Sequence, residues 1–466
     1  MNGQRFTLAL LAIVASCCTA VPNASSQNLT DEWVEEMAGP LIENRVVDGL
    51  SIGYIEGNHY GIVHLGSSTR VGKNANNLTL YELGSVSKVF TGLLLADAVV
   101  RGEVDLNAAA DVANSAGIRL PSRDGMSIKW IDLSTHRSGL PRLPGNLPVV
   151  DLVNPYRDYD SKKAADFLNQ YELPCRPGDS QEYSNFGGSV LGYLVAQNAG
   201  KAYQQLLQER IAKPLRMTDC TVSLSSDQKR RLATPHDKFG SETQPWTFAD
   251  LPGAGGIHAT MRDMMRFAKA QLEPPTGTLG DAIELAWKQH READESGPAM
   301  GLGWVIAGDG QTRWHNGQTG GSHAALFVNR ELKCAVVVLC NTAVDEVDQL
   351  AMQLVLKAAG HESKPKPDDA LAQDINNLAI NAKLRRRLVG RYQLAPDFIF
   401  TVRDRDGHLM VSITNQPTQE VFPDSPTRWS YRGVDATLEF KLPKTGRARS
   451  LVLHQNGMEQ TARRID

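Results

Sequence analysis

Gly84-Ser85-Val86-Ser87-Lys88 leads directly into Val89-Phe90-Thr91-Gly92-Leu93-Leu94-Leu95-Ala96-Asp97-Ala98-Val99-Val100. This largely apolar run predicts a buried helix, and Gly84 with Ser85 suits its N-terminus. Ser85 and Lys88 then lie on one face of the helix, so that a hydroxyl stands beside an amine able to take its proton. The positive end of the helix dipole favours the same chemistry. Because Ser-x-x-Lys recurs by chance, an exposed serine and lysine on an ordinary helix is the alternative.

The length and composition bound the rest of the chain. At 466 residues it is too long for one compact core, so we expect two domains. Its 41% apolar and 22% charged residues and net charge of −3 are typical of a soluble globular protein. The absence of a basic excess or of a Lys/Arg run argues against a nucleic-acid partner.

The N-terminus has the pattern of an export signal. Arg5 precedes a short apolar run from Phe6 to Cys18, too short to span a bilayer comfortably as a mature anchor. Val14-Ala15-Ser16-Cys17 resembles a bacterial lipoprotein box, which would make Cys17 the lipidated first residue. Ordinary cleavage before Gln27 is the alternative. Either way we expect an exported protein, periplasmic or extracellular, held to a membrane only through a signal or a lipid at Cys17.

Four cysteines remain after processing. Cys334 and Cys340 bracket a predicted buried strand and stand about 20 Å apart, too far to bond each other. A Cys175–Cys220 bridge is compatible with export but is not required by the sequence. The cysteine spacings match no zinc pattern.

The order of predicted elements indicates the fold. Residues 50–55 and 60–66 alternate like paired strands, and a helical region from Ser161 to about Leu215 follows the Ser85 helix. Strands return between Leu302 and Leu339, before a closing helix from about Asp345 to Ala359. This order predicts an α/β fold with an antiparallel sheet made from both chain ends, flanked by helices and carrying a helical insertion.

The C-terminal part of the chain differs in pattern. A charged, Pro-containing stretch predicts a linker over 361–380. Short strands follow, with the hairpin dipeptides Asp406-Gly407 and Asn456-Gly457 between them. We therefore expect a signal over 1–27, a catalytic domain over 28–360 and a small all-β module over 381–466, in the form of a half-open barrel.

Two further segments complete a pattern with the Ser85 helix. Tyr183-Ser184-Asn185 and His315-Asn316-Gly317 follow Ser85-Val86-Ser87-Lys88 in order. This order resembles the serine β-lactamase and penicillin-binding protein superfamily, in its class C-related branch of hydrolases and D-alanyl-D-alanine peptidases. The family carries Ser-x-x-Lys, Tyr-x-Asn and Lys/His-x-Gly motifs. The resemblance extends from about Glu32 to Gly360, and the ordered motifs are specific together although each is weak alone.

The resemblance implies a role for each of these residues. Ser85 would be the nucleophile, Lys88 its base and Tyr183 a second group for proton transfer, with a pKa tuned toward neutrality. Asn185 would hold the substrate and Lys88. His315 and Gly317 would border the substrate, and the backbone N–H groups of Ser85 and Gln318 would form the oxyanion hole.

Each segment also has a plainer interpretation. Tyr183 could pack beside Phe186, Asn185 could cap a helix, and Asn316-Gly317 is a good hairpin turn. We assign no chemistry to the histidines His136, His258 and His323. Lys444-Thr445-Gly446 matches the third motif literally, but we interpret it as a turn of the C-terminal module.

His315 departs from the lysine that β-lactamases and transpeptidases usually carry. Histidine is mostly neutral at pH 7, so it pairs less well with a substrate carboxylate. Esterases and D-amino-acid amidases of the superfamily tolerate this change. We therefore predict an exported serine hydrolase that works without cofactor or metal. It would act on an ester or a peptide amide, such as a peptidoglycan-derived peptide, and at most weakly on β-lactams.

A catalytically weak protein that binds cell-wall peptide fragments is the alternative from another functional class. An unrelated α/β-hydrolase or a metallohydrolase is disfavoured, because the chain has neither Gly-x-Ser-x-Gly nor His-Glu-x-x-His.

Overall fold

The computed structural model describes residues 29–69, 73–148, 153–361, 382–396, 398–405, 408–414, 418–431, 436–455 and 458–466. The predicted signal, nearly all of the predicted linker and both hairpin dipeptides of the C-terminal module lie outside these residues. The division of the chain into domains therefore stays a proposal. Within the described ranges, no helix has the length and apolar character needed to cross a bilayer.

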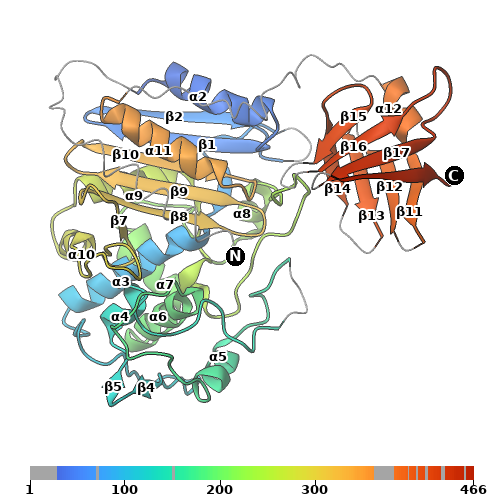
Figure 1. Ribbon diagram of the computed structural model, residues 1–466. Helices are drawn as coiled ribbons and strands as arrows, with labels where there is room; N and C mark the ends of the chain where they lie inside the picture. Colours follow the sequence, from blue (N-terminus) through green and yellow to red (C-terminus); the bar gives the residue numbers. More distant parts are fainter. Residues whose placement is uncertain are drawn as a thin grey trace.

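A six-stranded antiparallel sheet with the order β2-β1-β10-β9-β8-β7 is the frame of the larger part (Figure 1). Strands from the two ends of this part meet where Leu50 of β1 pairs with Cys340 of β10, which confirms the predicted topology. The strands are β1 (Gly49–Glu56), β2 (His59–Gly66), β7 (Val305–Ile306), β8 (Thr312–Gln318), β9 (His323–Asn329) and β10 (Cys334–Cys340).

Side-chain alternation along β10 explains why this strand is apolar throughout. Val336 and Val338 face a cluster formed with helices α2 (Asp31–Glu43) and α11 (Glu346–Ala358). Val337 and Leu339, one residue on, belong to the other core cluster on the opposite face of the sheet. The strand is buried on both sides, and no polar face is needed.

Helices of the insertion form the second layer, below the sheet in Figure 1. The remaining helices of this part are α3 (Ser87–Val100), α4 (Trp130–Ser134), α5 (Ser161–Leu168), α6 (Asn185–Asn198), α7 (Tyr203–Leu207), α8 (Ser226–Arg231), α9 (Met261–Leu272) and α10 (Thr278–Trp287). Two short strand pairs accompany them, β3 (Leu80–Glu82) with β6 (His258–Thr260) and β4 (Ser122–Arg123) with β5 (Met126–Ser127).

Helix α3 is the central helix of this layer. A 3₁₀ turn over Gly84–Val86 precedes it, and every residue from Ser87 to Ala98 is buried. A helix that is apolar all round must be covered on all sides, and α3 contacts α4, α6, α7 and α10. The predicted buried helix is confirmed, and Ser85 lies in the turn that opens it.

The C-terminal part is a closed eight-stranded barrel, preceded by α12 (Ala382–Leu388). The predicted small all-β, barrel-like module is confirmed, but the barrel is closed and not half-open, because the last strand returns to the first and pairs Tyr392 with Arg464. The strands are β11 (Gly390–Ala395), β12 (Phe398–Arg405), β13 (His408–Ile413), β14 (Gln419–Pro423), β15 (Arg428–Tyr431), β16 (Ala436–Lys441), β17 (Ser450–Gln455) and β18 (Met458–Arg464). Lys444-Thr445-Gly446 lies in the loop between β16 and β17, as predicted.

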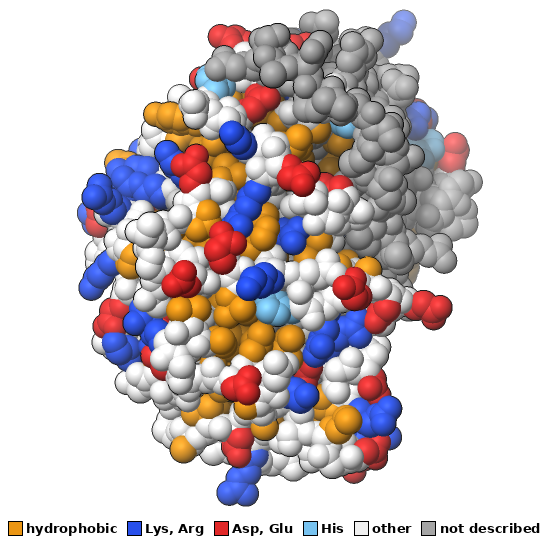
Figure 2. Space-filling view, turned by 90° about the vertical axis from the view of Figure 1, so that its left-hand side faces the viewer, with side chains coloured by type: hydrophobic (Ala, Val, Ile, Leu, Met, Phe, Trp, Pro, Cys, Tyr) orange, Lys and Arg blue, Asp and Glu red, His pale blue; other side chains and the backbone are white. Residues whose placement is uncertain are grey.

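The thiols and the surface add two observations. Cys175, Cys220, Cys334 and Cys340 are all free, so the Cys175–Cys220 bridge does not form here. On the face shown in Figure 2, basic and acidic side chains are interspersed, with apolar patches between them. Such a mixture agrees with the near-balanced composition.

Candidate active site

The structure brings Ser85 and Lys88 into direct contact. The Lys88 Nζ lies 2.9 Å from the Ser85 Oγ. Ser85 is partly exposed, whereas Lys88 is 4% exposed beneath it. The alternative of two independent surface side chains therefore does not hold.

Lys88 is surrounded by hydrogen-bond acceptors and not by acids. Its Nζ also donates to the Asn185 Oδ1 at 2.8 Å and to the Ala254 carbonyl at 2.9 Å. Burial, with the positive charge of Arg142 as a second cause, holds the pKa of Lys88 well below its ordinary value. A neutral amine can give its two N–H groups to Asn185 and Ala254 and turn its lone pair to Ser85. The geometry thus suits a base that takes the Ser85 proton.

Tyr183 lies against Lys88 and two imidazoles. The Lys88 Nζ is 4.9 Å from the centre of the Tyr183 ring, and the ring is 4.4 Å from that of His136. Phe186 packs on Tyr159 and Phe167 instead, so the plainer interpretation of Tyr183 is not supported.

The pKa of Tyr183 moves in the direction opposite to the one expected. Burial raises it to about 12, although the Ser85 side chain and the Arg142 charge act to lower it. Tyr183 therefore keeps its proton at neutral pH. It can donate or relay a proton, but because it is protonated when the reaction begins it is a poor base for the first step.

Asn185 stands at the first residue of α6, yet it does not cap the helix. The cap is Ser184, whose hydroxyl accepts from the Gly187 N–H at 2.7 Å. The Asn185 side chain is thereby free to reach Lys88, as the motif predicts.

His315 is a buried, neutral imidazole. It is 2% exposed, and its ring centre is 6.3 Å from that of Tyr183. Burial and the nearby Lys88 lower the pKa of His315 to about 3. Its Nδ1 donates to the Asn316 carbonyl at 2.5 Å, and its Nε2 has no hydrogen-bond partner within the described part of the chain.

The Asn316-Gly317 pair lies inside β8 and forms no hairpin turn. Asn316 pairs with Ala325 of β9, and its amide donates to the Asp348 carboxylate of α11 at 2.6 Å. Alternation along the strand turns Asn316 away from the side of His315 and Gly317. The hairpin interpretation was wrong because the strand continues to Gln318.

Two glycines let the end of β8 touch the start of α3. A Cβ on Gly317 would lie 2.5 Å from the Ser85 nitrogen, and one on Gly84 would lie 2.7 Å from the Gln318 nitrogen. Gly84 also has a φ of +48°, which disfavours any side chain. The two N–H groups named for the oxyanion hole thus belong to backbones in close contact.

Gly317→Ala tests this contact. We expect kcat to fall about 10²-fold, the cost of losing one oxyanion donor, because the methyl group forces the two backbones apart. The measurement is kcat on a p-nitrophenyl ester, with folding checked by thermal unfolding. Gly145→Ala is the control, since its Cβ would meet only a Phe167 ring atom at 3.6 Å. A folded Gly317→Ala variant with unchanged kcat would contradict this account of the contact.

Glu82, just before the Ser85 turn, is a buried acid that was not singled out from the sequence. Its carboxylate accepts from the Trp246 N–H at 2.8 Å and from the Ser322 hydroxyl at 3.1 Å. Burial raises its pKa to about 7. Glu82 thus joins the turn after Gln318 to the loop that carries Trp246.

Three more residues near the site were missed or set aside. His136 accepts from the Ser184 N–H at 3.2 Å and lies on the Tyr183 ring, so it positions the Tyr183 segment. Arg142 lies over the Tyr183 ring as its second cationic neighbour, 5.2 Å from the ring centre, and Tyr156 shares a hydrogen bond with Asn185. Arg142 lies six residues after His136, and no motif in the sequence singled it out. The same holds for Tyr156.

His258 and His323 interact with residues outside the Ser85–Lys88 group. Burial lowers the pKa of His258 to about 4, and the His323 Nε2 is 2.8 Å from Asp348. Within the described ranges, no group of three or more His, Cys, Asp or Glu side chains could hold a metal ion.

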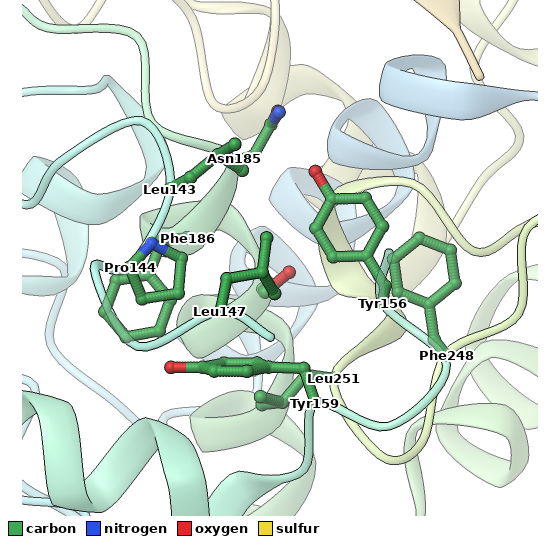
Figure 3. Close-up of a pocket in the computed structure, with 10 residues that line it drawn as sticks. Leu143, Pro144, Leu147, Tyr156, Tyr159, Asn185, Phe186, Phe248 and Leu251 are labelled. Atoms are coloured by element: carbon green, nitrogen blue, oxygen red, sulfur yellow. The ribbon is translucent and has the colours of Figure 1, made fainter. Parts of the chain in front are cut away.

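A small pocket, with a cavity volume of about 10 Å³ that would hold roughly one water molecule, adjoins Asn185. Tyr156 stacks on Phe248, with ring centres 5.0 Å apart, and Leu147 lies between these rings and Phe186 (Figure 3). The lining of this pocket is mainly apolar and consists of Leu143, Pro144, Leu147, Tyr156, Tyr159, Asn185, Phe186, Ser189, Phe248 and Leu251.

Comparisons with known proteins agree with this arrangement. The D-alanyl-D-alanine-carboxypeptidase/endopeptidase AmpH of Escherichia coli (strain K12) is 28% identical over 317 residues, 64% of this chain and 80% of that protein. A Beta-lactamase of the same strain is 28% identical over 304 residues, 64% and 76% of the two chains. Penicillin-binding protein 4* of Bacillus subtilis (strain 168) is 25% identical over 420 residues, 82% of this chain and 87% of that protein.

Solved structures agree on the fold. A class C beta-lactamase superposes with a TM-score of 0.61 at 18% identity, over 72% of this chain and 97% of the other. A Beta-Lactamase/D-Alanine Carboxypeptidase from Pseudomonas syringae gives 0.61 at 19% identity, over 72% and 99%. The sequence profile described as Beta-lactamase matches residues 34–360. The chain therefore belongs to the Beta-lactamase family and is a serine hydrolase.

Proposed function

We propose that this protein is an exported hydrolase that cleaves an ester or a peptide amide through an acyl-enzyme at Ser85. The observation that carries the proposal is the contact of Ser85 with a buried Lys88 that has acceptors and no acid around it. Relatives named as a D-alanyl-D-alanine peptidase, a β-lactamase and a penicillin-binding protein support the substrate class.

The proposed first half-reaction joins the Ser85 Oγ to the substrate carbonyl carbon. Lys88 takes the hydroxyl proton, and the oxyanion lies between the N–H groups of Ser85 and Gln318. The carbonyl bond to the leaving group then breaks, and the alcohol or amine receives the proton through Lys88 or Tyr183. Water repeats the sequence on the acyl-enzyme, releases the acid and returns the proton to Ser85.

The neutral His315 supports an ester or amide over a β-lactam. A cation in the place of His315 would attract the carboxylate of a penicillin, whereas a neutral imidazole provides only hydrogen bonding.

A substrate panel tests the proposal. We expect kcat/KM for p-nitrophenyl butyrate or for a D-Ala-D-Ala peptide to exceed that for nitrocefin, with all activity lost in Ser85→Ala. Nitrocefin turnover above both other substrates would contradict the proposed substrate class. Labelling by a fluorescent penicillin without turnover of any substrate would instead support the cell-wall-binding alternative.

Export is part of the proposal and rests on the pattern of residues 1–27 alone. Mass spectrometry of the N-terminal peptide from the native host tests it. Retention of the Arg5–Cys18 segment in the mature protein would contradict it, and a lipid on Cys17 would distinguish the lipoprotein from ordinary cleavage.

A further inference from the structure

Arg142 is a cation placed beside the catalytic groups by its backbone. Its carbonyl accepts from the N–H groups of Asn185 at 3.1 Å and of Phe186 at 3.2 Å, at the start of α6. Since Asn185 itself contacts Lys88, these bonds hold the Arg142 main chain at a defined place next to the site.

The guanidinium of Arg142 lies over the Tyr183 ring. Its central carbon is 5.2 Å from the ring centre, and the Lys88 Nζ approaches the same ring at 4.9 Å. The charge of Arg142 acts on the site, because it contributes to lowering the pKa of Lys88 and opposes the rise for Tyr183 and Tyr156. A positive charge therefore acts on the groups around the nucleophile.

The ion pairing of Arg142 differs from that of the arginines near it. Among the residues that the structure describes, no carboxylate pairs with the Arg142 side chain, which is exposed. Neighbouring arginines differ, since Arg137 pairs with Asp294 and Arg291 with Asp132 at 2.8 Å. The guanidinium fork of Arg142 is thus available, and a carboxylate is the group that it binds in a bidentate manner.

The other basic side chains of the site cannot bind a carboxylate in this way. Lys88 is buried and already contacts Ser85, Asn185 and Ala254, and His315 is buried and neutral. The alternative is that the exposed Arg142 only packs on Tyr183. It predicts that Arg142 has no effect on the preference between charged and neutral substrates.

We propose that Arg142 binds a carboxylate of the substrate and makes the enzyme select acidic esters or peptides over neutral ones. This inference rests on the proposed hydrolase function and adds a determinant of substrate class. Arg142 would act by binding, so its contribution belongs in KM more than in kcat.

Two pairs of esters test the proposal. The first pair is mono-p-nitrophenyl adipate and its methyl ester, which differ in charge on the acyl half. The second pair is 4-butyryloxybenzoate and its methyl ester, which differ in charge on the leaving group. At low salt we expect wild type to prefer the acid in at least one pair by about 10-fold in kcat/KM. Arg142→Met should remove that preference through KM, Arg142→Lys should keep part of it, and salt should weaken it.

Controls separate this proposal from the proposed function. The readout is the ratio of kcat/KM for the acid to that for its neutral partner, because removal of the Arg142 charge also acts on the pKa of Lys88 and so on the turnover of every ester. Arg157→Met, at an exposed arginine that pairs with Asp158, should keep that ratio. Absence of a preference in wild type, or its persistence in Arg142→Met, would overturn the role of Arg142. Ser85-dependent turnover of neutral esters would still leave the hydrolase proposal standing, whereas its absence would remove both.

Discussion

The Ser85→Ala variant is expected to lose about 10⁴- to 10⁶-fold in kcat on every ester and amide that the protein cleaves. The loss is this large because the hydroxyl forms the covalent bond, and among the described residues the Lys88 Nζ hydrogen-bonds to no hydroxyl besides that of Ser85. Steady-state kinetics on a p-nitrophenyl ester measure it. Stability should change little, since Ser85 is partly exposed and Lys88 keeps its contacts with Asn185 and Ala254.

Ser87→Ala is the matched control from the same motif. The Ser87 hydroxyl accepts from the buried Ile257 N–H at 3.1 Å, so its removal should cost about 1–3 kcal/mol of unfolding free energy. The variant should nevertheless keep a nucleophile. Equal losses of activity in folded Ser85→Ala and Ser87→Ala proteins would argue against Ser85 as the nucleophile.

Lys88→Arg is expected to lower kcat about 10²- to 10⁴-fold while Ser85 stays in place. Arginine cannot give up its proton near neutral pH, so it cannot serve as the base. Steady-state kinetics together with the rate of labelling by a fluorophosphonate measure the effect. A Lys88→Arg variant within 10-fold of wild type would show that Lys88 acts through its charge and not as a base.

The pH profile follows from the same assignment. The neutral amine is the active form, so kcat/KM should rise as pH rises through the lowered pKa of Lys88, and this limb should vanish in Lys88→Arg. Tyr183, with a pKa of about 12, should add no descending limb across the neutral range. Glu82 also titrates, with a pKa of about 7, and Glu82→Gln removes it while keeping an oxygen for the Trp246 N–H. A limb that moves with Glu82→Gln would belong to Glu82.

Local patterns predicted the central frame well. The apolar run after Lys88 became the buried α3, and the alternating residues 50–55 and 60–66 became β1 and β2. Burial of one or both faces determines such elements, and it produces a periodic pattern of apolar residues in the sequence. The meeting of Ser85, Lys88, Tyr183 and Asn185 was also expected, although from a resemblance in motif order and not from any local pattern.

Properties that depend on distant contacts were not visible in the sequence. The barrel closes through Tyr392 and Arg464, and the Asn316-Gly317 pair stays extended because β9 pairs along it. The pKa of Tyr183 rises because of its surroundings, which no motif records. The sequence did not reveal Arg142 for the same reason. Its proposed role depends on the Tyr183 ring beneath it and on the lack of a paired acid among the described residues.

The most direct test of the central claim is covalent labelling of the folded protein, with a fluorophosphonate and with a fluorescent penicillin, followed by peptide mapping. We predict that the fluorophosphonate adds once, on the peptide that contains Ser85, and that Ser85→Ala and heat-denatured protein take up no label. The penicillin should mark the same serine more slowly, because His315 is neutral. Failure of both reagents to mark Ser85 in folded protein, or labelling of another residue, would contradict the account.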